Sequence, residues 1–152
     1  FSWRGWYDAA RYCSLYEVNQ EEALAWVYRS IGMNRNFSNL WVRFELLEAL
    51  DRDAEAEQAR GEALAAATEA ELNQLGYEYM ASARLDRAIQ VFASNAEIHP
   101  ESWNVHDSLA EALAARGHVE EAIELYTQAL AMVDDQDQKV RISRTLEELR
   151  SR

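Results

Sequence analysis

A 34-residue repeat is the feature that most constrains how this chain folds. Segment 72–79 (LNQLGYEY) corresponds in its order of large and small residues to 106–113 (HDSLAEAL), which begins 34 residues later. Segment 87–92 (RAIQVF) corresponds in the same way to 121–126 (EAIELY). A period of this length is typical of arrays in which each short unit packs only against its neighbours. We therefore expect a repeat protein.

Small residues recur where the two helices of one unit would have to cross. These positions hold Gly76, Ala88, Ala110 and Ala122. Large residues that can fill the space alongside are Tyr79, Phe92, Leu113 and Tyr126. Ala or Gly at a crossing lets two helix axes approach closely. Because the chain has only 5 Gly and 1 Pro and is rich in good helix formers, we expect an all-α fold.

These residues resemble the tetratricopeptide repeat, in which a small residue follows a large apolar one and precedes an Ala, an aromatic residue and a Pro. Leu75-Gly76, Ala88, Phe92 and Pro100 give this pattern in the third unit, whereas the fourth has Asp134 in place of the Pro. The resemblance implies one solenoid domain of antiparallel helix pairs, an α-α superhelix. The expected repeats are about 4–36, 37–68, 69–102 and 103–136, followed by a capping helix at about 137–151. Its expected apolar stripe is Val140, Ile142, Leu146 and Leu149.

The whole chain also resembles the C-terminal helical region of secreted bacterial proteins of unknown function that carry an all-β domain at the N-terminus. The resemblance rests on segments 6–13 (WYDAARYC), 19–26 (NQEEALAW) and 98–103 (IHPESW). It implies a periplasmic or secreted protein, and without it a cytoplasmic one is expected. The chain begins FSWRGW, without an initiator Met or a signal sequence, so we interpret it as a fragment of a longer protein.

The charge of the chain argues against two classes of partner. The chain has 27 acidic and 15 basic residues, a net charge of −12. Nucleic-acid binding needs clustered Lys and Arg that neutralise phosphates, and docking on anionic membranes needs a similar excess of positive charge. Runs of uncharged residues are too short for a transmembrane helix, so we expect no membrane insertion.

Sequence motifs for catalysis and for metal binding are absent. The chain has no HExxH, no phosphate-binding loop and no nucleophile elbow. His99, His106 and His118 are too far apart along the chain for one helical face to gather them as ligands. The single cysteine, Cys13, excludes an internal disulfide framework, and we expect it to be a buried packing residue. We expect no enzyme activity, no cofactor and no metal.

The tetratricopeptide resemblance implies a concave groove, lined by the first helix of each unit, that takes extended or helical peptides. Carried over to this sequence, the groove residues are Tyr12, Trp41, Glu45, Glu48, Asn73, Tyr77, Met80, Asn104, Asp107 and Glu111. Such an acidic and aromatic surface favours a basic peptide or protein segment. Asn73 and Asn104 stand where chaperone-binding relatives have Lys, so capture of a C-terminal carboxylate is not expected. An ordinary, half-packed helix surface is the alternative interpretation.

The first seven residues include four aromatic ones, Phe1, Trp3, Trp6 and Tyr7. We interpret them as an interface at an uncovered N-terminal end, which contacts an upstream domain or pairs with itself in a two-fold homodimer. The alternative is that Trp3 and Trp6 fold back onto the first helix pair.

The predicted function is that of a protein–protein interaction module, a non-catalytic scaffold that binds a peptide or protein segment in the groove. The alternative function is that of a structural or self-association module, which dimerises or supports an upstream domain. A groove more polar than the chain ends favours peptide capture, whereas large apolar contacts at the ends favour assembly.

Overall fold

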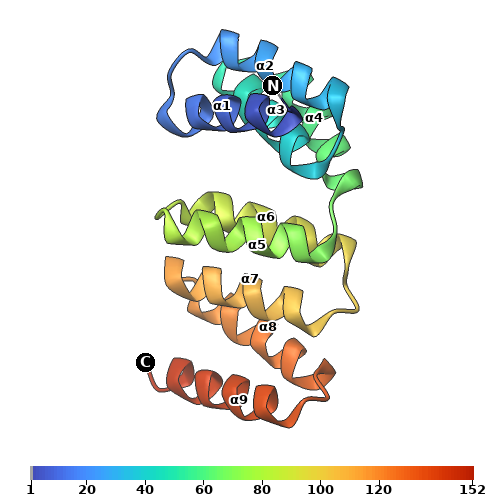
Figure 1. The fold of residues 1–152 in the computed structure, drawn as a ribbon. Coiled ribbons are helices and arrows are strands. Elements are labelled where there is room, and N and C mark those ends of the chain that lie inside the picture. The colour runs from blue at the N-terminus through green and yellow to red at the C-terminus, as the bar shows by residue number, and fades with distance from the viewer. Residues whose placement is uncertain (1) are drawn as a thin grey trace. The chain divides into compact units, whose positions relative to one another are not determined.

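The computed structural model describes residues 2–152, which form nine α-helices and no β-strand (Figure 1). The helices are α1 (Trp3–Tyr16), α2 (Gln20–Met33), α3 (Phe37–Ala49), α4 (Asp53–Ala66), α5 (Glu69–Ala81), α6 (Leu85–Ile98), α7 (Trp103–Arg116), α8 (Val119–Met132) and α9 (Gln136–Arg150). The predicted all-α fold class is confirmed.

Helices that follow one another pack as pairs, and the pairs form two compact units. In unit 1 (Phe1–Ala67), α1 packs on α2 and α3 packs on α4, and α3 also contacts α1 and α2. In unit 2 (Thr68–Arg152), α5 packs on α6 and α7 on α8, while α9 packs on α8. Each of the four expected repeat ranges thus contains one helix pair, and the range expected for the capping helix contains α9 alone. That the units form a single domain stays a prediction.

The small residues predicted at the helix crossings are buried. Ala88, Ala110 and Ala122 have no exposed surface, and Gly76 lies directly against the ring of Phe92. The large residues predicted to fill the space alongside, Tyr79, Phe92, Leu113 and Tyr126, are buried too. The predicted packing of helix pairs through small residues is therefore confirmed.

Helix α3 is the most buried helix of unit 1. Eight of its 13 residues are buried because it contacts α1, α2 and α4. Helix α4 buries only alanines against it, Ala56, Ala59 and Ala63. Large side chains on α3 and small ones on α4 allow the two helices to lie close together.

The four turns inside the helix pairs share one backbone geometry. Glu17, Asp51, Ala83 and Gly117 have positive φ angles between 55° and 96°. The residue after each of them donates its backbone N–H to the carbonyl five residues earlier, as Val18 does to Cys13 and His118 does to Leu113. This combination is the Schellman motif. Gly117, between α7 and α8, is the one glycine among these four turn residues.

Helix α9 buries a narrower stripe than predicted. Ile142, Leu146 and Leu149 are buried, but Val140 is 50% exposed, so its place in the stripe was wrong. Val140 precedes Ile142 by two residues, which is about 200° around a helix. Asp135 caps the start of α9, where its Oδ1 accepts a hydrogen bond of 2.9 Å from the backbone N–H of Gln138.

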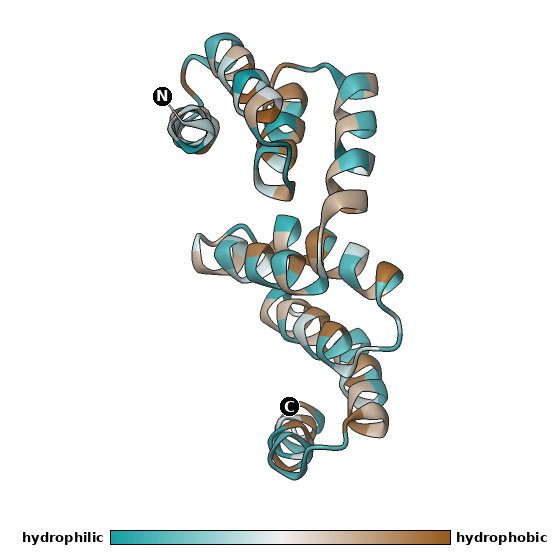
Figure 2. Cartoon of the chain, turned by 45° about the vertical axis from the view of Figure 1, so that its right-hand side comes forward, coloured by the Kyte–Doolittle hydropathy of each residue, from teal (hydrophilic) through white to brown (hydrophobic). Residues whose placement is uncertain are grey.

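Hydrophobic and hydrophilic residues alternate along the helices, as the brown and teal bands of Figure 2 show. This alternation is expected for helices that bury one stripe and expose the other. Within residues 2–152, no helix is both long enough and apolar enough to span a membrane.

Candidate functional site

Four of the predicted groove residues come together in unit 2. Tyr77 Oη, on α5, donates a hydrogen bond of 2.7 Å to Glu111 Oε2, on α7. Ser108 Oγ, also on α7, donates one of 2.7 Å to Asn73 Oδ1, on α5. Three predicted residues, Asn73, Tyr77 and Glu111, together with Ser108, which was not predicted, are called the unit-2 polar network below. Asp107, the fourth predicted residue, lies beside them on α7.

Tyr77 is the aromatic member of the unit-2 polar network. Its hydroxyl lies 3.3 Å from Ser108 Oγ and 2.7 Å from Glu111 Oε2, and its single proton favours the shorter contact to a carboxylate. The ring packs edge-on against Phe92, with 5.2 Å between the centroids. Burial, together with the bonded carboxylate of Glu111, raises the pKa of Tyr77 to about 12. Tyr77 is therefore a neutral, half-buried donor over the physiological pH range.

Asp107 links α7 to α9 instead of facing solvent. The residue is 5% exposed, and its Oδ2 accepts a hydrogen bond of 2.8 Å from Arg141 Nη2. Its Oδ1 is buried and has no hydrogen-bond partner within residues 2–152. Burial raises the pKa of Asp107, and the ion pair with Arg141 offsets only part of that cost. The prediction that Asp107 is presented on the groove surface was wrong because the residue is covered by the helices that follow it.

Met80 and Asn104 are the other predicted groove residues of unit 2. Both are half-buried. They lie on α5 and α7, the helices that supply the unit-2 polar network.

The predicted groove residues of unit 1 differ widely in exposure. Tyr12 is 58% exposed and lies against Tyr16, with ring centroids 4.5 Å apart. Glu45 is half-buried, and its Oε2 accepts a hydrogen bond of 3.3 Å from Ser14 Oγ. Glu48 is exposed.

Trp41 does not offer a surface for a ligand. It is 4% exposed, and its ring lies 4.9 Å from that of Phe44 and 5.9 Å from that of Phe37. Its prediction as a residue of the groove surface was wrong, because α3 packs against α1, α2 and α4 and Trp41 is part of the core.

The aromatic residues at the N-terminus are half-buried on the first helix pair. Arg29, on α2, lies over the ring of Trp6 at 4.8 Å, and the ring of Trp3 lies 6.2 Å from that of Tyr7. The carbonyl of Trp3 accepts a hydrogen bond of 2.8 Å from Ser30 Oγ. Phe1, the fourth residue of the predicted interface, lies outside the described residues.

The sequence analysis missed two residues that complete the site, Ser108 and Arg141. The repeat itself contains the signal for Arg141, since it follows Asp107 by 34 residues, as Glu111 follows Tyr77. Equivalent positions of successive units lie side by side in a repeat array. Opposite charges, or a donor and an acceptor, one period apart therefore predict a contact.

The described part of the chain, residues 2–152, has no group of three or more His, Cys, Asp or Glu residues that could hold a metal ion. Cys13 is buried, as predicted.

Stacked helix pairs with contacts one repeat apart define a class of helical repeat proteins, and comparisons with known proteins agree. Residues 105–140 match the family model described as tetratricopeptide repeat. The chain resembles the structure of "MamA 41-end" from Desulfovibrio magneticus RS-1, with a TM-score of 0.52 and 15% identity over 97% of this chain and 82% of that one. This likeness shows the fold, and the predicted tetratricopeptide-like helix-pair solenoid is confirmed.

Two further solved structures are similar to the chain. One is pilF of Pseudomonas aeruginosa, with a TM-score of 0.49 and 14% identity over 97% of this chain and 74% of that one. The other is TTC0263, a thermophilic TPR protein of Thermus thermophilus, with a TM-score of 0.49 and 21% identity over 93% of this chain and 79% of that one. A comparison with curated proteins gives no match.

Proposed function

We propose that the chain is a non-catalytic protein-interaction module that holds a peptide or protein segment against the unit-2 polar network. Tetratricopeptide-like scaffolds generally mediate contacts between proteins. The observation that carries the proposal is the position of Tyr77, a half-buried aromatic side chain beside the exposed carboxylate of Glu111. Aromatic residues that are partly packed and carry a polar tip are typical anchors in protein interfaces.

The partner segment is basic. The chain carries a net charge of −12, and Glu111 places a solvent-accessible carboxylate next to the aromatic ring. A Lys or Arg of the partner can pair with Glu111 while its aliphatic stem covers Tyr77. Asp107 is buried and already paired with Arg141, so it supports the site without offering a contact of its own.

The proposal is tested with a synthetic peptide library whose members differ in charge. Basic peptides with one aromatic or aliphatic residue are expected to bind, and binding weakens with salt because exposed charges are screened over about 8–10 Å. Tyr77→Ala is expected to weaken binding at least about thirtyfold, because the loss of an aromatic anchor costs about 2 kcal/mol or more. Tyr77→Phe, which keeps the ring, retains most of the affinity.

Glu111→Gln and Glu120→Gln form a matched pair of variants, each of which replaces one negative carboxylate by a neutral amide. Both remove one exposed carboxylate from a helix of unit 2, but Glu120 lies on α8, whereas the unit-2 polar network is formed by α5 and α7. Only Glu111→Gln is expected to weaken binding and to flatten its salt dependence. Peptides that bind equally well to both variants, or a library that yields only acidic binders, would show that the site is wrong.

A structural or self-association module is the second candidate function. The observation that favours it is a group of exposed apolar side chains at the end of α1. Tyr12, Leu15, Tyr16 and Val18 are each between 42% and 63% exposed. Solution mass as a function of concentration tests this second candidate, whereas the peptide library tests binding at the unit-2 polar network.

A further inference from the structure

The C-terminal helix α9 carries positive charge that the chain itself does not neutralise. The side chains of Lys139 and Arg144 have no ion pair or hydrogen bond within residues 2–152, whereas the side chain of Arg141 on the same helix is paired with Asp107. Residues 136–152 contain five basic and three acidic residues, in a chain with 27 acidic residues overall. The surface of α9 is therefore locally positive, although the net charge of the whole chain is strongly negative.

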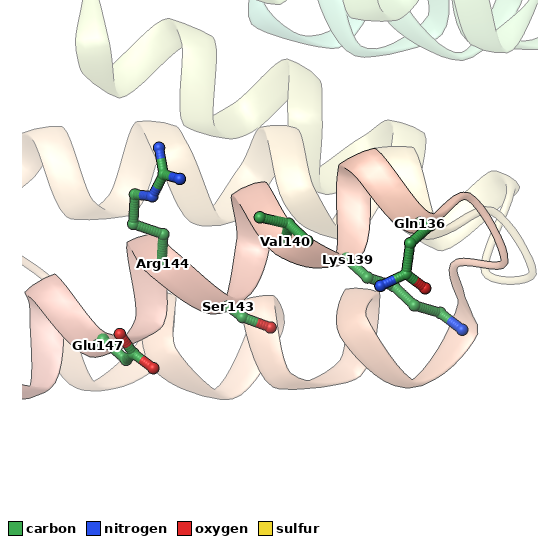
Figure 3. Close-up of a pocket in the computed structure, with 6 residues that line it drawn as sticks. All are labelled: Gln136, Lys139, Val140, Ser143, Arg144 and Glu147. Carbon is green, nitrogen blue, oxygen red and sulfur yellow. The ribbon is translucent and has the colours of Figure 1, made fainter.

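These cations border a shallow, open depression along α9. It has a volume of about 310 Å³ and is lined by Gln136, Lys139, Val140, Ser143, Arg144 and Glu147, called the outer face of α9 below. Figure 3 shows Lys139 and Arg144 extending from successive turns on either side of Val140. Val140 is 50% exposed. The outer face of α9 therefore combines an apolar centre with cationic edges.

The fold explains why this side of α9 has no cover. Helices α5 and α7 each have a paired helix after them, and α7 is contacted by α5 and α6 as well as by α8. Helix α9 occupies the position of the first helix of a further pair, and it packs on α8 through Ile142, Leu146 and Leu149. In a repeat array the uncovered side of a last helix is the side on which a next unit would pack.

Helix α1 presents the complementary surface at the other end of the chain. Tyr12 and Tyr16 follow the buried Ala10 by two and six residues, which places them about 200° and 240° around the helix from the core. They are 58% and 63% exposed, and Leu15 beside them is 42% exposed. Together with the exposed Asp8, these residues are called the exposed side of α1.

The charge of this region is opposite to that of α9. Residues 8–22 contain four acidic residues and one basic residue. The acidic ones, Asp8, Glu17, Glu21 and Glu22, are all exposed.

We propose that the outer face of α9 in one copy of the chain docks on the exposed side of α1 in a second copy, head to tail. The guanidinium of Arg144 and the ammonium of Lys139 can lie over the paired rings of Tyr12 and Tyr16, where cations are attracted to the ring faces. Asp8 and the other carboxylates of residues 8–22 neutralise the same cations. Val140 meets the apolar edge of Leu15, so that both exposed apolar surfaces are removed from water. This contact uses other residues than the unit-2 polar network, so it does not rest on peptide binding there; it gives a specific form to the second candidate function, self-association.

A head-to-tail contact has a consequence that a two-fold dimer does not have. Each copy uses two different surfaces, so copies joined in this way close into a ring or grow into an open chain, and a variant that lacks one surface is complemented by a variant that lacks the other. The average mass is expected to rise with concentration to that of a dimer or of a larger assembly. Because the contact is charged, the mass falls as salt is added.

Sedimentation velocity on the full chain tests the proposal with one variant for each surface. Lys139→Glu/Arg144→Glu alters the outer face of α9, and Tyr12→Ser/Tyr16→Ser alters the exposed side of α1. Arg84→Glu is the charge control, since Arg84 is an exposed arginine whose side chain also has no partner within residues 2–152. Far-UV circular dichroism and the unfolding midpoint show that each variant remains folded.

Each surface variant alone is expected to associate at least about tenfold more weakly, the loss of roughly one close interfacial charge pair or anchor. An equimolar mixture of the two variants restores association but stops at a 1:1 complex, because only one intact surface of each kind remains. Arg84→Glu behaves as the unmodified chain. The proposal is overturned by a chain that stays monomeric at all concentrations. It is equally overturned by a dimer that survives the α9 substitutions, or by folded variants whose mixture does not associate.

Discussion

Replacing Gly76 by Ala tests the close approach of α5 and α6 most directly. A β-carbon at Gly76 would lie 2.5 Å from Cζ and 2.7 Å from Cδ1 of Phe92, whereas carbon atoms in contact are normally about 3.5–4.0 Å apart. Phe92 is fully buried, so its ring has no free space into which it can move. We expect a cost near the upper end of the about 1–3 kcal/mol that overpacking causes.

The net effect is smaller because Ala is a better helix former than Gly. That difference is about 1 kcal/mol, so Gly76→Ala is expected to lower the free energy of unfolding by about 2 kcal/mol. For a chain of this size the midpoint of thermal unfolding falls by about 4–8 °C. Urea denaturation followed by circular dichroism at 222 nm measures the change, with an unaltered m-value as the sign that the folded state keeps its compactness.

Gly61→Ala is the matched control. Gly61 also lies inside a helix, α4, but a β-carbon there would meet nothing within 4 Å. The same substitution is expected to stabilise by about 0.5–1 kcal/mol, through helix propensity alone. A second control is Phe92→Leu, which makes room for the new methyl group. The double variant Gly76→Ala/Phe92→Leu is expected to be more stable, by about 1 kcal/mol or more, than the sum of the two single effects. If Gly76→Ala stabilised the protein as Gly61→Ala does, the helix crossing described here would be refuted.

Two further predictions concern the turns and the buried ion pair. Ala83→Gly is expected to stabilise the fold by up to about 1 kcal/mol, because an L-residue with positive φ is strained by about 1–2 kcal/mol. Gly117→Ala is expected to destabilise it for the same reason, although a β-carbon there would have open space. Equal shifts of the urea midpoint in the two variants would contradict this prediction. Arg141→Gln is expected to destabilise the fold at pH 7 by about 1–3 kcal/mol, because it leaves the buried carboxylate of Asp107 without its cation. Asp107→Asn is expected to cost little, because the half-exposed Arg141 that remains is solvated by water. The raised pKa of Asp107 means that the folded state holds its proton more tightly than the unfolded chain, so the contribution of this group to stability is present below the ordinary pKa of 3.8 and is lost as the pH rises above it. Denaturation of Asp107→Asn and of the unmodified chain at pH 4 and pH 7 checks the sign, and a variant that loses more stability at pH 7 than at pH 4 would contradict the assignment.

The helix pairs could be predicted from the sequence because the repeat records burial at fixed positions. Gly76 and Ala88 mark the crossing in one pair, and Ala110 and Ala122 mark it in the next. Small residues that recur with a fixed period indicate that two helices approach each other closely at those positions. The end of each pair is equally regular, so the predicted boundaries lie close to the helix ends of the structure.

The site was harder to predict because exposure depends on neighbours that the sequence pattern does not identify. Helix α3 is apolar on most of its circumference, so helical periodicity could not show that Trp41 faces the core. Asp107 stands at a position that the tetratricopeptide resemblance assigns to the groove surface, and nothing near it in the sequence shows that its cation lies on α9, one repeat later. Val140 shows the converse error, an apolar residue that is half exposed because nothing within residues 2–152 covers that side of the last helix.

The left-handed turns show which level of structure controls the fold. Only one of the four turn residues is Gly, and Glu17, Asp51 and Ala83 adopt positive φ in spite of their side chains. The local cost is about 1–2 kcal/mol for each of these residues. Each turn nevertheless repeats the same hydrogen bond from the following N–H to the carbonyl five residues earlier. Burying one large apolar side chain, such as Phe92 or Leu47, contributes about 1.5–3 kcal/mol, and every pair buries several. The packing of the two helices therefore imposes the turn geometry. The residue in the turn only sets the conformational cost that this packing has to offset.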